Sequence, residues 1–254
     1  MMESASRRKS GFTLVELLVT VSVIALLIAL VLPGLRLAMG SARSFKCQMG
    51  QRATAFDFSI FADGTLHGDR GTDSSRSDFS IETFQESQYG VDEFWRWGEV
   101  NQVSLPDAQG NDPMRCPEVR APLVLARNVP CSNGAVGPSA SVSYSFNLRL
   151  HRAQVIDSRG RPRARAVRLR ESILQEGGVP LLFDGDGERA TRQDVNAIYS
   201  APSLGDVIFG QDQFWFPSTR HNGGGNYAFL DGHVASSSSP LEEADWRWDF
   251  APIR

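Results

Sequence analysis

The chain begins with a short polar stretch and continues with a long apolar one. Residues 1–10 are polar and carry a cluster of three basic side chains at positions 7–9. After Leu17 only Thr20 and Ser22 are polar as far as Leu32. The residues from Phe12 to Leu32 would span about 31 Å as an α-helix, the thickness of a bilayer's hydrocarbon core. The pattern predicts a transmembrane helix over 12–33, and the basic cluster predicts a cytoplasmic N-terminus.

Glu16 is the one carboxylate inside this apolar segment. A charge within a membrane span is unfavourable unless it has a partner. A secretory signal peptide would end in a small-residue cleavage site, but Pro33-Gly34 follows the apolar run. Cleavage between Gly11 and Phe12 would place a new α-amine one helical turn from Glu16, where it would neutralise the carboxylate of the same or a neighbouring subunit.

The segment Lys9-Ser-Gly-Phe-Thr-Leu-Val-Glu-Leu-Leu18 resembles the cleavage and methylation motif of type IV pilins and type II secretion pseudopilins. The resemblance implies a leader over 1–11 that a prepilin peptidase removes after Gly11. It also implies that Phe12 becomes the N-methylated first residue. Glu16, fifth in the mature chain, would guide docking to other pilin-like subunits in the inner membrane.

A second helical pattern follows over residues 34–62. Pro33-Gly34 predicts a kink or a brief break, and Asp63-Gly64 predicts the end of the helix. An apolar stripe with steps of three and four predicts the face that packs against the head. Its members are Leu35, Ala38, Ala42, Phe45, Met49, Ala53, Phe56 and Ile60. Cys47 lies off this stripe, and we assign it no chemistry.

Residues 63–254 predict a β-rich exported head. Residues 141–147 and 166–170 alternate polar and apolar side chains, and 179–183 is a short apolar run. Asp231-Gly232, between two further short runs, predicts a hairpin with a type I′ turn. Because no strand–helix–strand alternation appears, we expect an antiparallel sheet packed on the N-terminal helix. The fold class is therefore α+β and pilin-like.

Residues 63–112 predict loops with short elements, and the aromatic cluster at 94–97 is more typical of burial than of ligand binding.

Charge and cysteines narrow the chemistry. Without residues 1–11 the chain carries 23 basic and 28 acidic residues, which argues against nucleic-acid binding. Cys116 and Cys131 stand fifteen apart in a loop-like stretch, so an exported head favours a disulfide between them. Cys47 is left over. The absence of a CxxC motif or a Cys/His cluster makes a zinc site an unfavoured interpretation.

Two charged segments suggest ligands. Asp184-Gly-Asp186-Gly-Glu188 places three carboxylates on a Gly-rich loop, a pattern that suits calcium, but we favour a solvated turn after a strand. Six arginines between positions 159 and 170 suit an anionic partner. Because the head is acidic, we favour a solvated segment that pairs with local acids.

The segment from His221 to Val234 holds the pattern H-x9-DG, formed by His221, Asp231 and Gly232. It is similar to the C-terminal segment of a family of pilin-like proteins with the same leader, the DUF1559-like proteins, in which its role is undefined. The residues themselves favour a hairpin that His221 braces near Asp231. A metal or acid–base site of His221, Asp231 and His233 is the alternative.

Together these patterns predict a pilin-like or pseudopilin subunit without enzymatic activity. It would assemble through its N-terminal helix, in a pilus or in type II secretion, with its head periplasmic or extracellular. The alternative is a binding module, displayed at the membrane or on a fibre, that recognises a glycan, calcium or a secreted cargo.

Overall fold

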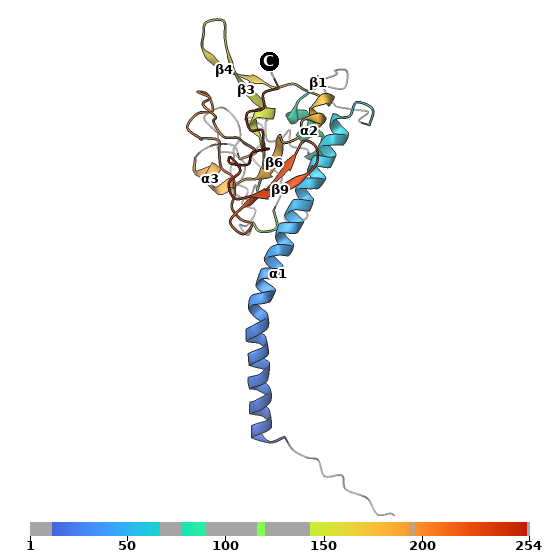
Figure 1. The fold of residues 1–254 in the computed structure, drawn as a ribbon, viewed down its shortest axis with the longest axis vertical. Coiled ribbons are helices and arrows are strands. Elements are labelled where there is room, and N and C mark those ends of the chain that lie inside the picture. The colour runs from blue at the N-terminus through green and yellow to red at the C-terminus, as the bar shows by residue number, and fades with distance from the viewer. Residues whose placement is uncertain are drawn as a thin grey trace, which may run out of the picture. The chain divides into compact units, whose positions relative to one another are not determined.

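The computed structural model describes residues 12–66, 78–89, 116–119, 143–193, 195 and 197–252 (Figure 1). The chain divides into two compact units, Met1–Ala42 and Arg43–Arg254, which are described separately below. The aromatic cluster at 94–97 lies outside the described residues. The described part of the second unit is a sheet-rich head joined to a long helix, which confirms the predicted α+β class.

Helix α1 (Leu14–Ala62) belongs to both units. Thr13 caps its start: the Thr13 backbone N–H and hydroxyl donate to Glu16 Oε2 over 2.9 and 2.8 Å, and Glu16 N–H donates to Thr13 Oγ1 over 3.3 Å. This is a capping box, in which side chains satisfy the free N–H groups of the first turn. The helix continues through Pro33, so the predicted break is wrong. A proline removes one backbone hydrogen bond and Gly34, a poor helix former, follows it, but the helix continues to Ala62.

The first unit is the apolar part of α1. Its side chains from Leu14 to Leu32 are exposed, and the helix is long and apolar enough to cross a membrane. An exposed apolar surface of this size is unfavourable in water and favourable in lipid. The protein is therefore membrane-anchored.

In the second unit, α1 buries a different face from the one that the hydrophobic pattern predicts. The buried residues are Cys47, Gln51, Thr54, Ala55, Phe58, Phe61 and Ala62. Phe45, Met49 and Phe56, from the predicted stripe, are 64%, 48% and 63% exposed. The prediction was wrong because the buried face includes the polar side chains of Gln51 and Thr54, each of which donates a hydrogen bond to a backbone oxygen. Gln51 Nε2, for example, donates to the backbone oxygen of Asn226 in the head over 3.2 Å.

The head is built on a five-stranded sheet in the order β7-β2-β6-β8-β9. Its strands are β2 (Tyr144–Asn147), β6 (Pro180–Asp184), β7 (Tyr199–Ser200), β8 (Gly225–Phe229) and β9 (Val234–Ser237). All neighbouring pairs are antiparallel except β2 and β7, which are parallel. Figure 1 shows β6 and β9 beside the cyan end of α1. The prediction of an antiparallel sheet is confirmed for every neighbouring pair of strands except β2 and β7.

Each face of the sheet carries a hydrophobic cluster. On the helix side, Phe58 and Phe61 of α1 make edge-to-face contacts with Phe79 and Phe84, with ring centroids 5.2–6.0 Å apart. A smaller cluster contains Phe183, Trp215, Tyr227, Phe229 and Trp248. Adjacent residues of one strand point to opposite faces, so Phe183 joins the second cluster while Leu182 joins the first.

The other described elements lie around this sheet. They are β1 (Asp78–Phe79), α2 (Ile81–Tyr89), η3 (Leu148–Leu150), β3 (Arg152–Ile156), β4 (Pro162–Ala166), β5 (Leu169–Arg170), η4 (Glu171–Gln175) and α3 (Gly187–Arg192). The hairpin β3–β4 carries part of the arginine run, and Arg161 and Arg163 lie 3.3 and 3.6 Å from Asp157. This local pairing agrees with the interpretation of a solvated segment.

The C-terminal hairpin β8–β9 forms where the sequence predicts it, but with a different turn. Gly232 has φ +85°, whereas Leu230 and Asp231 do not have positive φ. Gly232 N–H donates to Phe229 O, and Phe229 N–H donates to His233 O. This is a three-residue loop with glycine in the left-handed position, not a type I′ turn. The type I′ geometry occurs nearby, because Asn222 and Gly223 have φ +53° and +86° between hydrogen-bonded His221 and Gly224.

Candidate functional site

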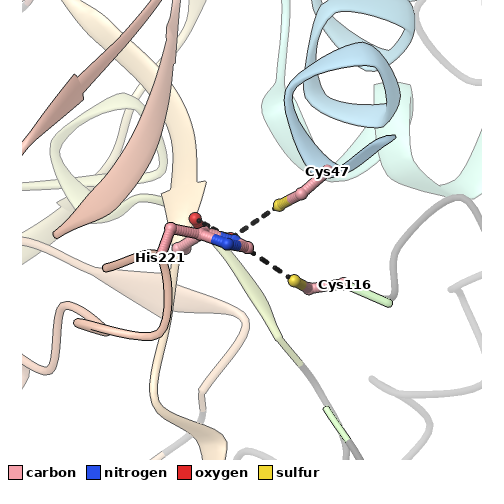
Figure 2. A group of neighbouring side chains, drawn as sticks. Cys47, Cys116 and His221 are labelled. Atoms are coloured by element: carbon pink, nitrogen blue, oxygen red, sulfur yellow. Dashed lines mark hydrogen bonds and ion pairs between the residues drawn. The ribbon is translucent and has the colours of Figure 1, made fainter. Parts of the chain in front are cut away.

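Four ionisable side chains from distant parts of the sequence converge beneath helix α1 (Figure 2). They are Cys47 of α1, Cys116 of the segment 116–119, Asp184 at the end of β6 and His221 of the turn before β8. One donor atom from each lies within 4.8 Å of the donor atoms of all the others. We call this group the Cys/Asp/His cluster.

Within the cluster the donor atoms are in direct contact. Cys47 Sγ lies 3.1 Å from Asp184 Oδ1, and His221 Nε2 lies 3.1 Å from Asp184 Oδ2. Cys116 Sγ lies 3.3 Å from the same His221 nitrogen. Cys47, Cys116 and Asp184 are fully buried, and His221 is 8% exposed. Such a concentration of ionisable groups away from water is unfavourable unless each is paired or coordinated.

Asp184 is held in the cluster by backbone and side-chain donors. The Asn226 N–H on β8 donates to Oδ2 over 2.7 Å, and the Arg220 guanidinium donates to Oδ1 over 3.3 Å. The next residue must be small, since a Cβ at Gly185 would lie 2.0 Å from Ser145 Oγ. The Asp-Gly pair therefore lets the end of β6 approach β2 closely while the carboxylate reaches the helix.

His221 is positioned by the Asn-Gly turn that follows it. Asn222 and Gly223 take left-handed backbone conformations that favour these residue types, so the chain reverses within two residues. His221 thereby pairs with Gly224 through two backbone hydrogen bonds of 2.9 and 3.0 Å. The turn fixes the imidazole between the sheet and Cys116.

The two thiols are also held locally. The Cys116 N–H donates to Ser143 Oγ over 2.5 Å, and the Val119 N–H donates to Cys116 O over 3.0 Å. The Tyr144 hydroxyl lies 3.2 Å from Cys47 Sγ. Ser143 therefore fixes the backbone of Cys116, and Tyr144 of β2 contacts the sulfur of Cys47.

The contacts perturb the acidities of the cluster. A hydrogen bond from Cys47, helped by one from His221, lowers the pKa of Cys116 to about 5 despite its burial. The same bond to Cys116, together with burial and the charge of Asp184, raises the pKa of Cys47. Burial lowers the pKa of His221, but the hydrogen bonds to Asp184 and Cys116 outweigh it and raise the pKa to about 10. The protein alone thus favours one thiolate, one thiol and an imidazolium.

The sequence pattern predicted that His221 lies near Asp231 and His233. The structure places Asp231 and His233 together, with Oδ1 and Nδ1 2.5 Å apart, but both side chains are at least 40% exposed. His233 stacks on Phe229, with ring centroids 4.1 Å apart. His221 instead contacts Asp184, so the expected brace near Asp231 and the acid–base trio with His233 are not formed.

The three carboxylates of the predicted calcium loop are engaged separately. Asp184 faces the Cys/Asp/His cluster. Asp186 Oδ1 accepts from the Arg189 N–H of α3 over 2.9 Å, and Glu188 lies 3.8 Å from Arg192. No converging group of these three is found within the described residues. Calcium binding here stays a prediction.

Cys131 and Gly11 lie outside the described residues, so the predicted disulfide and the processing site stay predictions. Cys116 is a free thiol in the structure, as is Cys47. Sequence reasoning missed the role of Cys47 and set zinc aside, because the four residues share no local spacing. The signal in the sequence was indirect: Cys47 interrupts the polar side of the helix, and His221 precedes a tight Asn-Gly turn.

The structure thus defines a membrane-anchored protein with a long N-terminal helix and a β-rich head. The model for the prokaryotic N-terminal methylation motif matches residues 6–32, which contain Gly11, Phe12 and Glu16. This match supports a type IV pilin-like protein that a prepilin peptidase processes. No curated protein and no solved structure shows a significant match to the chain.

Proposed function

We propose that the mature protein is a subunit of a pilus or pseudopilus, assembled through helix α1 after cleavage between Gly11 and Phe12. The methylation motif at residues 6–32 carries this proposal. The head would then lie on the periplasmic or extracellular side. Type II secretion is one assembly that this leader fits and a type IV pilus is the other, because pilins and secretion pseudopilins share the motif.

The exposed surface of α1 beyond the first unit supports assembly with further copies. Phe45, Met49 and Phe56 lie at steps of four and seven, which places them on one side of the helix. All three are about half exposed or more, and they lie away from the face that the head covers. A second pilin-like helix packed on this side would remove apolar surface from water at about 25 cal/mol per Å2.

Glu16 has two candidate roles that an experiment separates. In the single chain its carboxylate completes the capping box with Thr13. In an assembly it would instead accept the α-ammonium of Phe12 from the same or a neighbouring subunit. Pairing with the α-ammonium requires the negative charge of Glu16, whereas the capping box requires mainly the Thr13 partner.

The test is to express the full-length chain with a prepilin peptidase and to determine its N-terminus by mass spectrometry. We expect a chain that starts at methylated Phe12, and no cleavage in a Gly11→Val variant. Crosslinking in membranes should give multimers for the native chain and for Thr13→Val, but not for Glu16→Gln. A different N-terminus would contradict processing, and equal loss in both variants would assign Glu16 to capping only.

The alternative of a displayed binding module also stays a prediction. The aromatic cluster at 94–97, which would bind a ligand, lies outside the described residues. The acidic loop that begins at Asp184 shows no converging carboxylates within the described residues. A chain with the mature N-terminus that gives no multimers in membranes would favour this alternative.

A further inference from the structure

The donor atoms of the Cys/Asp/His cluster lie close enough together to surround one metal ion. Zinc sits about 2.3 Å from sulfur and about 2.0–2.2 Å from nitrogen and oxygen, so neighbouring ligands in a tetrahedral site are roughly 3.3–3.8 Å apart. Cys47 Sγ lies 3.1 Å from Asp184 Oδ1, and His221 Nε2 lies 3.1 Å from Asp184 Oδ2 and 3.3 Å from Cys116 Sγ. With one oxygen of Asp184 as the ligand atom, all four donor atoms lie within 4.8 Å of one another. Shifts of about 1 Å or less would therefore place all four donors around one ion.

The types of donor select the cation. Two thiols and an imidazole are soft or borderline ligands, which suit Zn2+, whereas Ca2+ and Mg2+ prefer oxygen. Four protein donors complete a tetrahedron and leave no position for water or substrate. With three of the four side chains fully buried, this is the arrangement of a structural zinc site.

The surroundings of His221 match those of a metal ligand. Its Nε2 faces the cluster, while Nδ1 is buried and lies 3.3 Å from Glu118 Oε2 without the alignment of a hydrogen bond. Metal-bound histidines usually donate their other ring N–H to a carboxylate or a carbonyl. A small rotation of the ring would bring Nδ1–H onto Glu118 while Nε2 turns from Asp184 to the ion.

The charges around the site also suit a divalent cation. Zn2+ with two thiolates, one carboxylate and a neutral imidazole carries one net negative charge. Arg220, which donates to Asp184 Oδ1, lies beside that charge and is only 19% exposed. A bound ion requires deprotonated thiols and a neutral imidazole, so affinity should fall as pH falls.

From this geometry we propose that Cys47, Cys116, Asp184 and His221 bind one structural Zn2+ ion in the head. The ion joins α1, through Cys47, to the end of β6 and to the first residue of the H-x9-DG segment. It therefore fastens the membrane-anchored helix to the sheet. This role is independent of whether the protein forms a filament.

The experiment measures zinc in the native full-length chain, purified in mild detergent without chelators. We expect about one zinc per chain by elemental mass spectrometry. After removal of zinc by a chelator and addition of Co2+, we expect the visible absorption bands of tetrahedral cobalt with thiolate ligands. Chelation should also lower the melting temperature of the native chain, and added Zn2+ should restore it.

Matched variants locate the site. Cys47→Ser, Cys116→Ser and His221→Asn should each reduce bound zinc to less than a tenth, whereas Cys131→Ser and His233→Asn should retain it. If the ligand variants do not fold, the chelation and cobalt measurements on the native chain still show whether it binds zinc. The proposal is overturned if the folded native chain holds no stoichiometric zinc and gives no cobalt spectrum. A mass two hydrogens lower, with the disulfide mapped by peptide digestion to Cys47 or Cys116, would overturn it as well.

Discussion

The buried face of α1 can be tested with two phenylalanines that lie two residues apart on the same helix. Phe58 is fully buried and contacts the rings of Phe79 and Phe84, whereas Phe56 is 63% exposed. The sequence pattern placed Phe56 in the core, and the structure places Phe58 there. Replacing each with alanine removes the same atoms and changes helix propensity equally, so the difference reports burial alone.

The expected difference is large. Truncating a buried phenylalanine typically lowers the free energy of unfolding by about 3–5 kcal/mol, through lost transfer energy and the cavity left behind. For a domain of this size, 1 kcal/mol corresponds to about 2–4 °C in melting temperature. Phe58→Ala should therefore lower the melting temperature by about 6–20 °C. Phe56→Ala should change the free energy of unfolding by no more than about 0.5 kcal/mol.

The assay is thermal unfolding of the full-length chain in detergent, followed by tryptophan fluorescence. Trp215 and Trp248 lie in the second hydrophobic cluster, so their emission reports unfolding of the head. The same variants are then crosslinked in membranes, where Phe56→Ala should reduce multimers because it removes exposed apolar surface. Equal destabilisation by both variants, or a larger effect of Phe56→Ala, would refute the assignment of the buried face.

Two further predictions concern the interior of the head. His151 is buried and stacks on Tyr199, and burial, helped by the charge of Arg152, lowers its pKa to about 3. It lies 3.4 Å from Glu82, but Arg152 Nε donates to His151 Nε2, so a neutral ring that donates through Nδ1 explains both contacts. Between pH 6.5 and 3 only the unfolded state binds the proton on His151, so the free energy of unfolding should fall as the pH falls through that window. In a His151→Phe variant the denaturant midpoint should therefore depend less on pH over the same window. An unchanged slope would show that His151 is protonated in the fold. At the end of β6, Gly185→Ala should cost about 1–3 kcal/mol through overpacking against Ser145. Adding Ser145→Gly should recover part of this loss in the same melting assay, and no loss in the single variant would contradict the close approach.

The anchor could be predicted from the sequence because its chemistry is local. An apolar run of bilayer length, a preceding basic cluster and one carboxylate near the processing site are adjacent along the chain. Membrane insertion responds to such segment-wide properties. The strands around 144–147 and 180–184 were likewise found from their side-chain patterns, and the C-terminal hairpin from its Asp-Gly pair.

The face of the helix and the cluster beneath it could not be found in this way. Apolar periodicity identifies the buried side of a helix only when burial is apolar, and here Gln51 is buried because the head offers it a partner. Cys47, Cys116, Asp184 and His221 are separated along the chain by 37 to 69 residues and have no shared spacing. Their proximity depends on how α1 crosses β6 and β8. The sequence by itself determined the anchor, its processing motif and the α+β class, because these depend on neighbours along the chain. Only the tertiary structure decided which side of α1 is buried and which four residues meet there.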